Sequence, residues 1–156
     1  MKIEAQLKEA WRNNQQMNLR LLRALDEESL AIRGPKGRTR NVRANWIHLH
    51  HTRLNWIGAM MENPPKVERL KGRDKLKTAD ILEGLEASSA GIERLLEELA
   101  NQMPAAPFKG SVTAFLGMML AHEAHHRAHI LLLIRNAGKA LPRTVRDSLW
   151  DFGEDL

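Results

Sequence analysis

Residues 111–130 read SVTAFLGMMLAHEAHHRAHI, and their apolar and histidine side chains are spaced like one face of an α-helix. Such side chains return every three or four residues from Val112 to Leu133. The complete seam consists of Val112, Phe115, Met119, His122, His126, His129 and Leu133. A seam that steps by threes and fours is typical of a helix packed nearly parallel or antiparallel to its neighbours. This stretch therefore predicts a long helix that faces the interior of a helical bundle.

Three further stretches repeat apolar residues at helical spacing. The first stretch has one seam, Leu7, Trp11, Met17, Leu21 and Leu25, which Asn14 interrupts. The second stretch, from about Val42 to Met61, has two seams: one of Val42, Trp46, Leu49, Trp56 and Met60, and another of Ile47, His48, His51 and Leu54. The third stretch has the seam Leu85, Ser88, Ile92, Leu95 and Leu99. No useful length of chain alternates with period two. We therefore predict an all-α protein, a four-helix bundle, with the Trp and Met side chains of the seams in its core.

Residues that break or cap helices divide the chain at matching places. The predicted breaks are Gly34-Pro35-Lys36-Gly37, Pro64-Pro65, Pro104 and Pro107, and Gly138 with Pro142; Thr78 and Ser111 are expected as N-caps, and a short C-terminal helix is expected around Val145–Trp150. The sequence contains no repeat and no linker long enough to separate domains. Residues 1–156 are therefore predicted to form a single domain.

Composition and charge limit the classes of protein that fit. The 156 residues include no cysteine, which fits a reducing compartment and leaves His, Asp and Glu to bind any metal. The N-terminus is polar and no apolar run approaches about 20 residues, so we expect a cytoplasmic protein that spans no membrane. Lys and Arg outnumber Asp and Glu by 24 to 19, but much of this excess lies in residues 33–43 and 66–77, which we interpret as solvated loops. Since tyrosine is absent and aromatic residues are scarce, nucleic acid is not an expected partner.

All seven histidines fall in two short segments. They are His48, His50 and His51 in the first segment, and His122, His125, His126 and His129 in the second. Residues four apart on a helix are neighbours, so His122 and His126 can face one ion, and both lie on the apolar seam. Side-by-side imidazoles in a core would each carry a desolvation cost that a bound divalent ion relieves. The first segment offers one or two further ligands, because His48 and His51 share a face. Three histidines with open positions are typical of a catalytic metal site.

The segment from His122 to His126 also matches the zinc-protease pattern H-E-x-x-H. In those proteases the glutamate is the general base and a third ligand follows downstream. Here the downstream acidic candidates, Asp147, Asp151, Glu154 and Asp155, lie in or near a charged tail. No G-x-x-H extension follows, and no sheet edge is predicted to hold a peptide. The protease interpretation is therefore disfavoured, and Glu123 is expected either to support the ligands or to lie on the surface.

Two segments carry a family resemblance. VRANWIHLHHTRLNW (42–56) and SVTAFLGMMLAHEAHHRAHI (111–130) resemble the two signatures of the DinB/YfiT-like metalloenzyme superfamily. In that family a metal-binding His precedes a Trp by about two helical turns, and H-x-x-H-H-R-G-Q follows an apolar run. The resemblance covers nearly the whole chain and implies a four-helix bundle with metal ligands at His48, His122 and His126. His51 is left as an ambiguous fourth ligand.

The sequence departs from the second signature at Ala128 and His129, where many relatives have Gly and Gln. His129 lies on the ligand face one turn beyond His126, which leaves open which histidines the ion selects. His125 and Arg127 match the signature and are interpreted as packing or surface residues.

The expected function is that of a metal-dependent enzyme with a small-molecule substrate. The resemblance implies a divalent ion such as Zn, Ni or Fe, a homodimer, and in some relatives a thiol-dependent S-transferase activity. Without cysteine in the chain, the sulfur would come from a thiol cosubstrate; bound hydroxide would instead make a hydrolase. One alternative is a non-catalytic protein that senses or stores metal, with a saturated coordination shell. Another is a nucleic-acid binder that uses residues 33–43.

Overall fold

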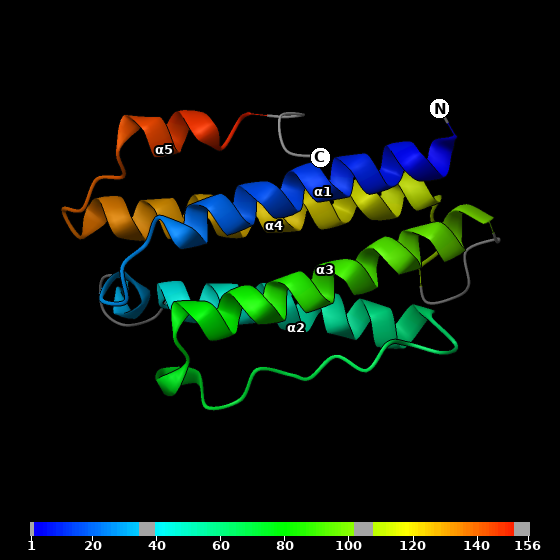
Figure 1. Ribbon diagram of the computed structural model, residues 1–156, viewed down its shortest axis with the longest axis horizontal. Helices are drawn as coiled ribbons and strands as arrows, with labels where there is room; N and C mark the ends of the chain where they lie inside the picture. The colour runs from blue at the N-terminus through cyan, green and yellow to red at the C-terminus, as the bar shows by residue number, and fades with distance from the viewer. Residues whose placement is uncertain (1, 35–39, 102–107, 152–156) are drawn as a thin grey trace.

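The computed structural model describes residues 2–34, 40–101 and 108–151 and contains no strand within them. Four long helices lie side by side along the molecule (Figure 1). They are α1 (Ile3–Arg23), α2 (Val42–Met60), α3 (Thr78–Asn101) and α4 (Val112–Asn136), followed by the short α5 (Arg143–Ser148); two 3-10 turns, η1 (Ser29–Ala31) and η3 (Arg73–Lys75), lie in the connections. The predicted all-α four-helix bundle with a short C-terminal helix is confirmed.

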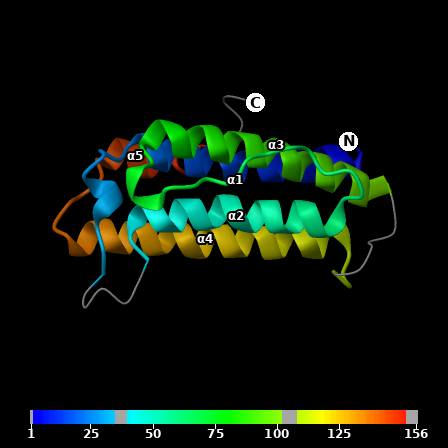
Figure 2. The ribbon, with the colours of Figure 1, turned by 90° about the horizontal axis from the view of Figure 1, so that it is seen from below.

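The order of the helices brings the two histidine segments together. α4 packs against both α1 and α2, and α3 packs against α1 and α2 on the other side. Figure 2 shows α2 and α4 side by side along their length. Residues 61–77 run back along the bundle, so α2 and α3 point in the same direction (Figures 1 and 2). The α2–α4 contact positions the candidate site, because each of these helices carries one of the histidine segments.

The core consists of two apolar clusters separated by a polar layer. One cluster contains Leu21, Trp46, Leu85 and Ile130, and the other contains Trp11, Ile57, Leu95 and Phe115. Along each long helix, buried polar residues occupy the positions between the two clusters. They are Asn14, Gln15 and Asn18 on α1, His50 and Arg53 on α2, Ser88 and Ser89 on α3, and Glu123, His126 and Arg127 on α4. Asn14, which interrupts the first apolar seam, therefore lies inside the bundle as part of this layer.

The helix boundaries confirm several predicted breaks and correct two. The Ser111 hydroxyl caps α4 by accepting the N–H of Ala114 at 3.2 Å, as expected. Gly138, at φ 75°, ends α4: its N–H donates to the Arg135 carbonyl at 3.0 Å, and the N–H of Lys139 donates to the Ile134 carbonyl at 3.1 Å.

The prediction of Thr78 as N-cap is wrong, because Thr78 is already helical and its N–H donates to the Glu27 carboxylate at 2.9 Å. The C-terminal helix also begins and ends earlier than predicted, at Arg143–Ser148. Residues 66–77 form an irregular segment apart from the turn at Arg73–Lys75, as expected of a loop. The breaks predicted at 35–37 and at Pro104 and Pro107 lie outside the described residues.

Candidate metal centre

Three imidazoles from two helices meet where α2 contacts α4. His48 comes from α2, and His122 and His126 lie one turn apart on α4. One nitrogen from each ring lies within 4.8 Å of the others. The ring centroid of His48 lies 5.3 Å from that of His122 and 4.7 Å from that of His126. In the described part of the chain, this is the one group of three or more His or acidic side chains gathered closely enough to hold a metal ion.

The environment keeps these imidazoles neutral, which is the form that binds a metal. Burial, and then the charge of neighbouring groups such as Arg40, lowers the pKa of His48. Burial likewise lowers the pKa of His122, and it lowers the pKa of His126 from 6.5 to about 3, with His122 and His48 adding to the effect. His126 is buried, whereas His48 and His122 are half-buried, so solvent reaches the group.

Asn45 fixes the orientation and the tautomer of His126. The Asn45 amide is fully buried, and its NH₂ donates to the main-chain oxygens of Asn41 at 2.9 Å and Arg40 at 3.3 Å. The amide oxygen must therefore be the atom that faces Nδ1 of His126, at 2.8 Å. An amide oxygen can only accept a hydrogen bond, so Nδ1 of His126 carries the hydrogen and donates it, and Nε2 is left with a lone pair. No sequence pattern points to Asn45, because its role depends on contact with a residue 81 positions away.

The partial burial of His122 and the chemistry of the three ligands also fit a bound metal ion. Nδ1 of His122 is buried and has no hydrogen-bond partner among the residues that the structure describes. A buried nitrogen without a partner costs free energy, and an ion among the three rings would relieve such a cost. The donor set itself, three neutral imidazoles, suits several divalent ions of the first transition series and does not distinguish among them.

The remaining histidines lie outside this group. His50 is fully buried, and its ring nitrogens face the main-chain oxygens of Gly84 at 2.8 Å and Glu68 at 2.9 Å, which ties residues 61–77 to α3. The ring of His51 lies 5.5 Å from that of His50. On α4, His125 is exposed, and His129 directs Nδ1 at the oxygen of Asn45 at 3.3 Å. Neither the ambiguous fourth ligand His51 nor His129 is gathered with the other three.

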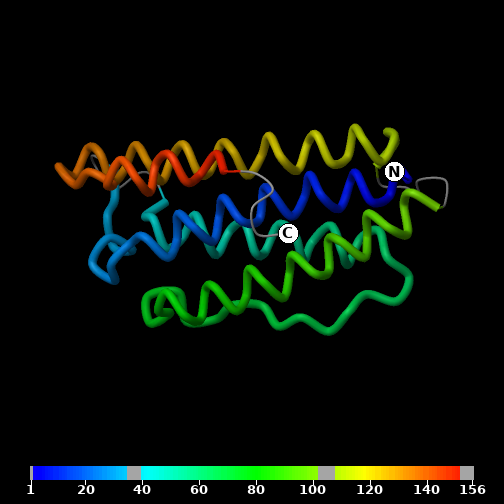
Figure 3. Tube along the Cα trace, turned by 45° about the horizontal axis from the view of Figure 1, so that its top comes forward, coloured from blue at the N-terminus to red at the C-terminus, as the bar shows by residue number. Residues whose placement is uncertain are grey.

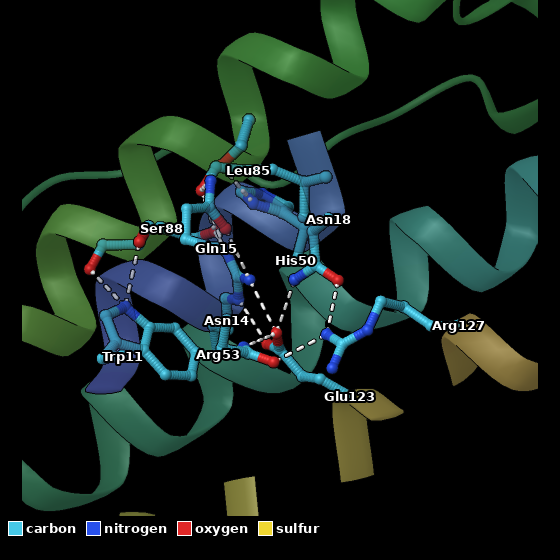
Figure 4. A network of polar contacts seen from close by, with 12 residues as sticks. Trp11, Asn14, Gln15, Asn18, His50, Arg53, Leu85, Ser88, Glu123 and Arg127 are labelled. Carbon is cyan, nitrogen blue, oxygen red and sulfur yellow. Dashed lines mark hydrogen bonds and ion pairs between the residues drawn. The ribbon is translucent and has the colours of Figure 1, made fainter. Parts of the chain in front are cut away.

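The Glu123 carboxylate lies in the polar layer, where it meets Arg53 and Asn14 (Figure 4). Its carboxylate pairs with Arg53, from Nε to Oε1 at 2.7 Å and from Nη2 to Oε2 at 2.9 Å. Asn14 and Asn18 also donate to Oε2. Burial alone would raise the pKa of Glu123, but the charge and hydrogen bonds of Arg53, with those of the two amides, more than offset it and lower the pKa. Glu123 is thus a buried anion that accepts from Arg53, Asn14 and Asn18, and this engagement disfavours the general-base role that a zinc protease needs.

The polar layer extends beyond the ion pair. Arg53 also donates to Gln15 at 2.8 Å and to the main-chain oxygen of Leu85 at 2.9 Å, and its guanidinium lies 4.8 Å from the centre of the Trp11 ring. Arg127 donates to the side-chain oxygens of Asn14 and Asn18 at 2.6 and 2.8 Å. Of the two alternatives expected for each of Glu123 and Arg127, the surface position is wrong, because both side chains are buried parts of one hydrogen-bonded network.

Comparison with known families assigns the chain. The model of the DinB family matches residues 1–151, which include all four long helices and both histidine segments. The chain belongs to the DinB family. This membership and the three-histidine group are compatible with metal binding in this DinB protein. No match is found among curated proteins. No helix within the described residues of this DinB protein is both long and apolar enough to cross a membrane.

Acid should destabilise the metal-free protein. The pKa of His126 is about 3 in the folded chain against an ordinary 6.5, so between these values the unfolded chain binds a proton that the folded chain rejects. The free energy of unfolding should therefore fall as the pH drops below 6.5, by up to about 1.4 kcal/mol per pH unit from this residue. Urea unfolding between pH 7 and 5 measures the slope, and a His126→Asn variant should flatten it. A slope unchanged by the substitution would contradict the assignment.

Proposed function

We propose that this DinB protein is a metal-dependent enzyme that holds one divalent ion through His48, His122 and His126. The observation that carries the proposal is the convergence of three neutral imidazoles from two helices within 4.8 Å. The lone pair that Asn45 leaves on Nε2 of His126 and the unpartnered Nδ1 of His122 both support it. Zn, Ni and Fe all suit three imidazoles.

Catalysis is favoured over storage by the number of ligands. The gathered group has three members, and no fourth His, Asp or Glu joins it in the chain as described. A site with three protein ligands keeps a position for water or substrate, whereas a storage site is expected to be saturated. His48 and His122 are half-buried, so a small molecule can approach from solvent.

The favoured reaction is transfer of a small-molecule thiol to an electrophile, with hydrolysis as the second reaction of the same site. When bound, the ion would lower the pKa of a thiol or a water molecule placed in its open position. The Arg40 side chain is exposed, and its charge adds a smaller effect to that of burial in lowering the pKa of all three histidines, so the same charge would favour an anionic sulfur. In the transfer, sulfur forms a bond to carbon, the leaving group departs with its bonding electrons, and the thiol proton passes to solvent. The chain contains no cysteine, so the sulfur belongs to the cosubstrate.

The test uses protein purified without a histidine tag and loaded separately with Zn, Ni and Fe. Loss of free thiol is followed with cysteine or glutathione and a chlorinated aromatic electrophile, beside hydrolysis of a nitrophenyl ester. We expect metal-dependent thiol loss that His122→Ala abolishes and that His125→Ala, an exposed residue of the same helix, leaves intact. Ester hydrolysis alone would assign a hydrolase. Full metal occupancy without turnover of either kind would contradict the enzymatic proposal and favour a non-catalytic metal-binding protein.

Asn45 should matter for metal affinity although it does not reach the ion. Asn45→Leu removes the acceptor for Nδ1 of His126, so the ring loses both its fixed orientation and its tautomer. Loss of such a supporting partner typically weakens metal binding about 10–100-fold. Titration with Zn measures the change. Asn55→Leu is the matched control, since Asn55 is exposed on the same helix and bonds only Arg69 among the described residues. Equal affinity of both variants and the unaltered protein would refute the role of Asn45.

A further inference from the structure

A groove between α1, α4 and α5 lies on another face of α4 from the three histidines. α5 folds back beside the C-terminal half of α4 and packs on α1 (Figures 1 and 3). The groove has a volume of about 640 Å³, within the range of about 300–1,000 Å³ that small-molecule sites occupy. Its apolar walls come from Met17, Leu131, Leu141, Leu149 and Trp150. Trp150 is 68% exposed at one side, so the groove presents apolar surface to solvent.

Every charged residue that lines the groove is cationic: Arg127, Arg135, Lys139 and Arg146. Lys139 is engaged, because it bonds Asp26 at 3.0 Å. Arg135 and Arg146 are exposed, and neither pairs with an acidic side chain of residues 2–34, 40–101 or 108–151. The groove therefore combines apolar walls with two exposed cations that no acidic side chain within the described ranges pairs.

Arg127 adds a buried positive charge at the same place. Arg53 and Glu123 neutralise one another in the polar layer, which leaves Arg127 as an excess cation. Arg127 is 8% exposed, and the partners of its Nη1 are the neutral amides of Asn14 and Asn18. No carboxylate of the described chain lies within ion-pair distance of it. Buried cations are usually paired, so the charge of Arg127 at the groove favours an anion there.

We propose that this groove binds a small amphipathic molecule with one anionic head, such as a medium-chain carboxylate. The positive charge of Arg127, Arg135 and Arg146 attracts the head, and the exposed guanidinium groups of Arg135 and Arg146 suit a carboxylate because their planar donors match its two oxygens. The alkyl chain covers the apolar walls at Leu131, Leu149 and Trp150. This site is separate from the metal centre and does not depend on it.

Calorimetric titration of the whole 156-residue chain, free of metal, with octanoate tests the proposal, with 1-octanol as a neutral probe of the same length. We expect octanoate to bind with one site per chain and octanol to bind at least about tenfold more weakly, as the loss of a charge-assisted contact implies. Arg135→Ser with Arg146→Ser should weaken octanoate about tenfold and leave octanol unchanged. Leu131→Gln should weaken both probes, because it alters the apolar wall.

Four results would overturn the proposal. The first is the absence of octanoate binding at millimolar concentration, and the second is equal binding of octanoate and octanol. The third is octanoate binding that appears only after Phe152→Ala, which would make the end of the chain itself the occupant. The fourth is a dimer in sedimentation that Leu131→Gln dissociates and octanoate does not, which would assign the groove to a second copy of the chain.

Discussion

Glu123→Ala should destabilise this protein by about 3–5 kcal/mol, because it leaves a fully buried cation without its partner. Arg53 has no exposed surface, and Glu123 is its only anionic partner among the described residues. Removal of the carboxylate also leaves Asn14 and Asn18 without the acceptor that their NH₂ groups share. Urea unfolding followed by circular dichroism at pH 7 measures the change in the free energy of unfolding.

The bundle provides a matched control for this substitution. Arg12 and Glu93 also form an arginine–carboxylate pair between α1 and α3, at 2.9 Å, but its side chains are partly exposed. Glu93→Ala should therefore cost no more than about 1 kcal/mol. If Glu123→Ala fails to fold, the double variant Arg53→Met with Glu123→Leu keeps the test open, since apolar replacement of a whole buried pair is often neutral or stabilising. A cost for Glu123→Ala as small as that for Glu93→Ala would refute the role given to the polar layer.

His126→Ala should lower the affinity for a divalent ion by more than about 100-fold, beyond the range expected when a supporting partner is lost. His126 is the most buried of the three rings and lies close to both others, with centroids 4.7 Å from His48 and from His122. Its removal leaves two half-buried donors on different helices. Titration with Zn in a competing chelator measures the affinity.

His125→Ala is the control, because His125 neighbours His126 in the chain but is exposed. It should leave both affinity and stability within error of the unaltered protein. The thermal unfolding of metal-free His126→Ala separates loss of binding from loss of the fold. A folded variant that binds Zn as tightly as the His125→Ala control would contradict the ligand assignment.

Local sequence patterns were sufficient to predict the fold and the two histidines of the site that lie on α4. Apolar residues repeated every three or four positions predicted four long helices. Residues such as Ser111 and Gly138 marked helix ends, because capping depends on neighbours in the chain. His122 and His126 could be paired from spacing alone, since residues four apart share a helix face.

The third histidine of the site and the residues that support it are determined by contacts between helices, which sequence spacing does not reveal. α2 has apolar residues on two faces, so its rotation, and hence whether His48 or His51 faces α4, could not be derived from periodicity. The buried position of Glu123 depends on its partners Arg53 and Asn14, which are 70 and 109 positions away in the chain. Asn45 was missed for the same reason.

Anomalous diffraction from a crystal of the Zn-loaded protein, recorded on both sides of the Zn absorption edge, tests the central claim most directly. One peak per chain is predicted, about 2.0–2.1 Å from a nitrogen of each of His48, His122 and His126, with Nε2 as the ligand atom of His126. A peak bound by other side chains, or no peak in protein that elemental analysis shows to contain Zn, would contradict the proposed centre.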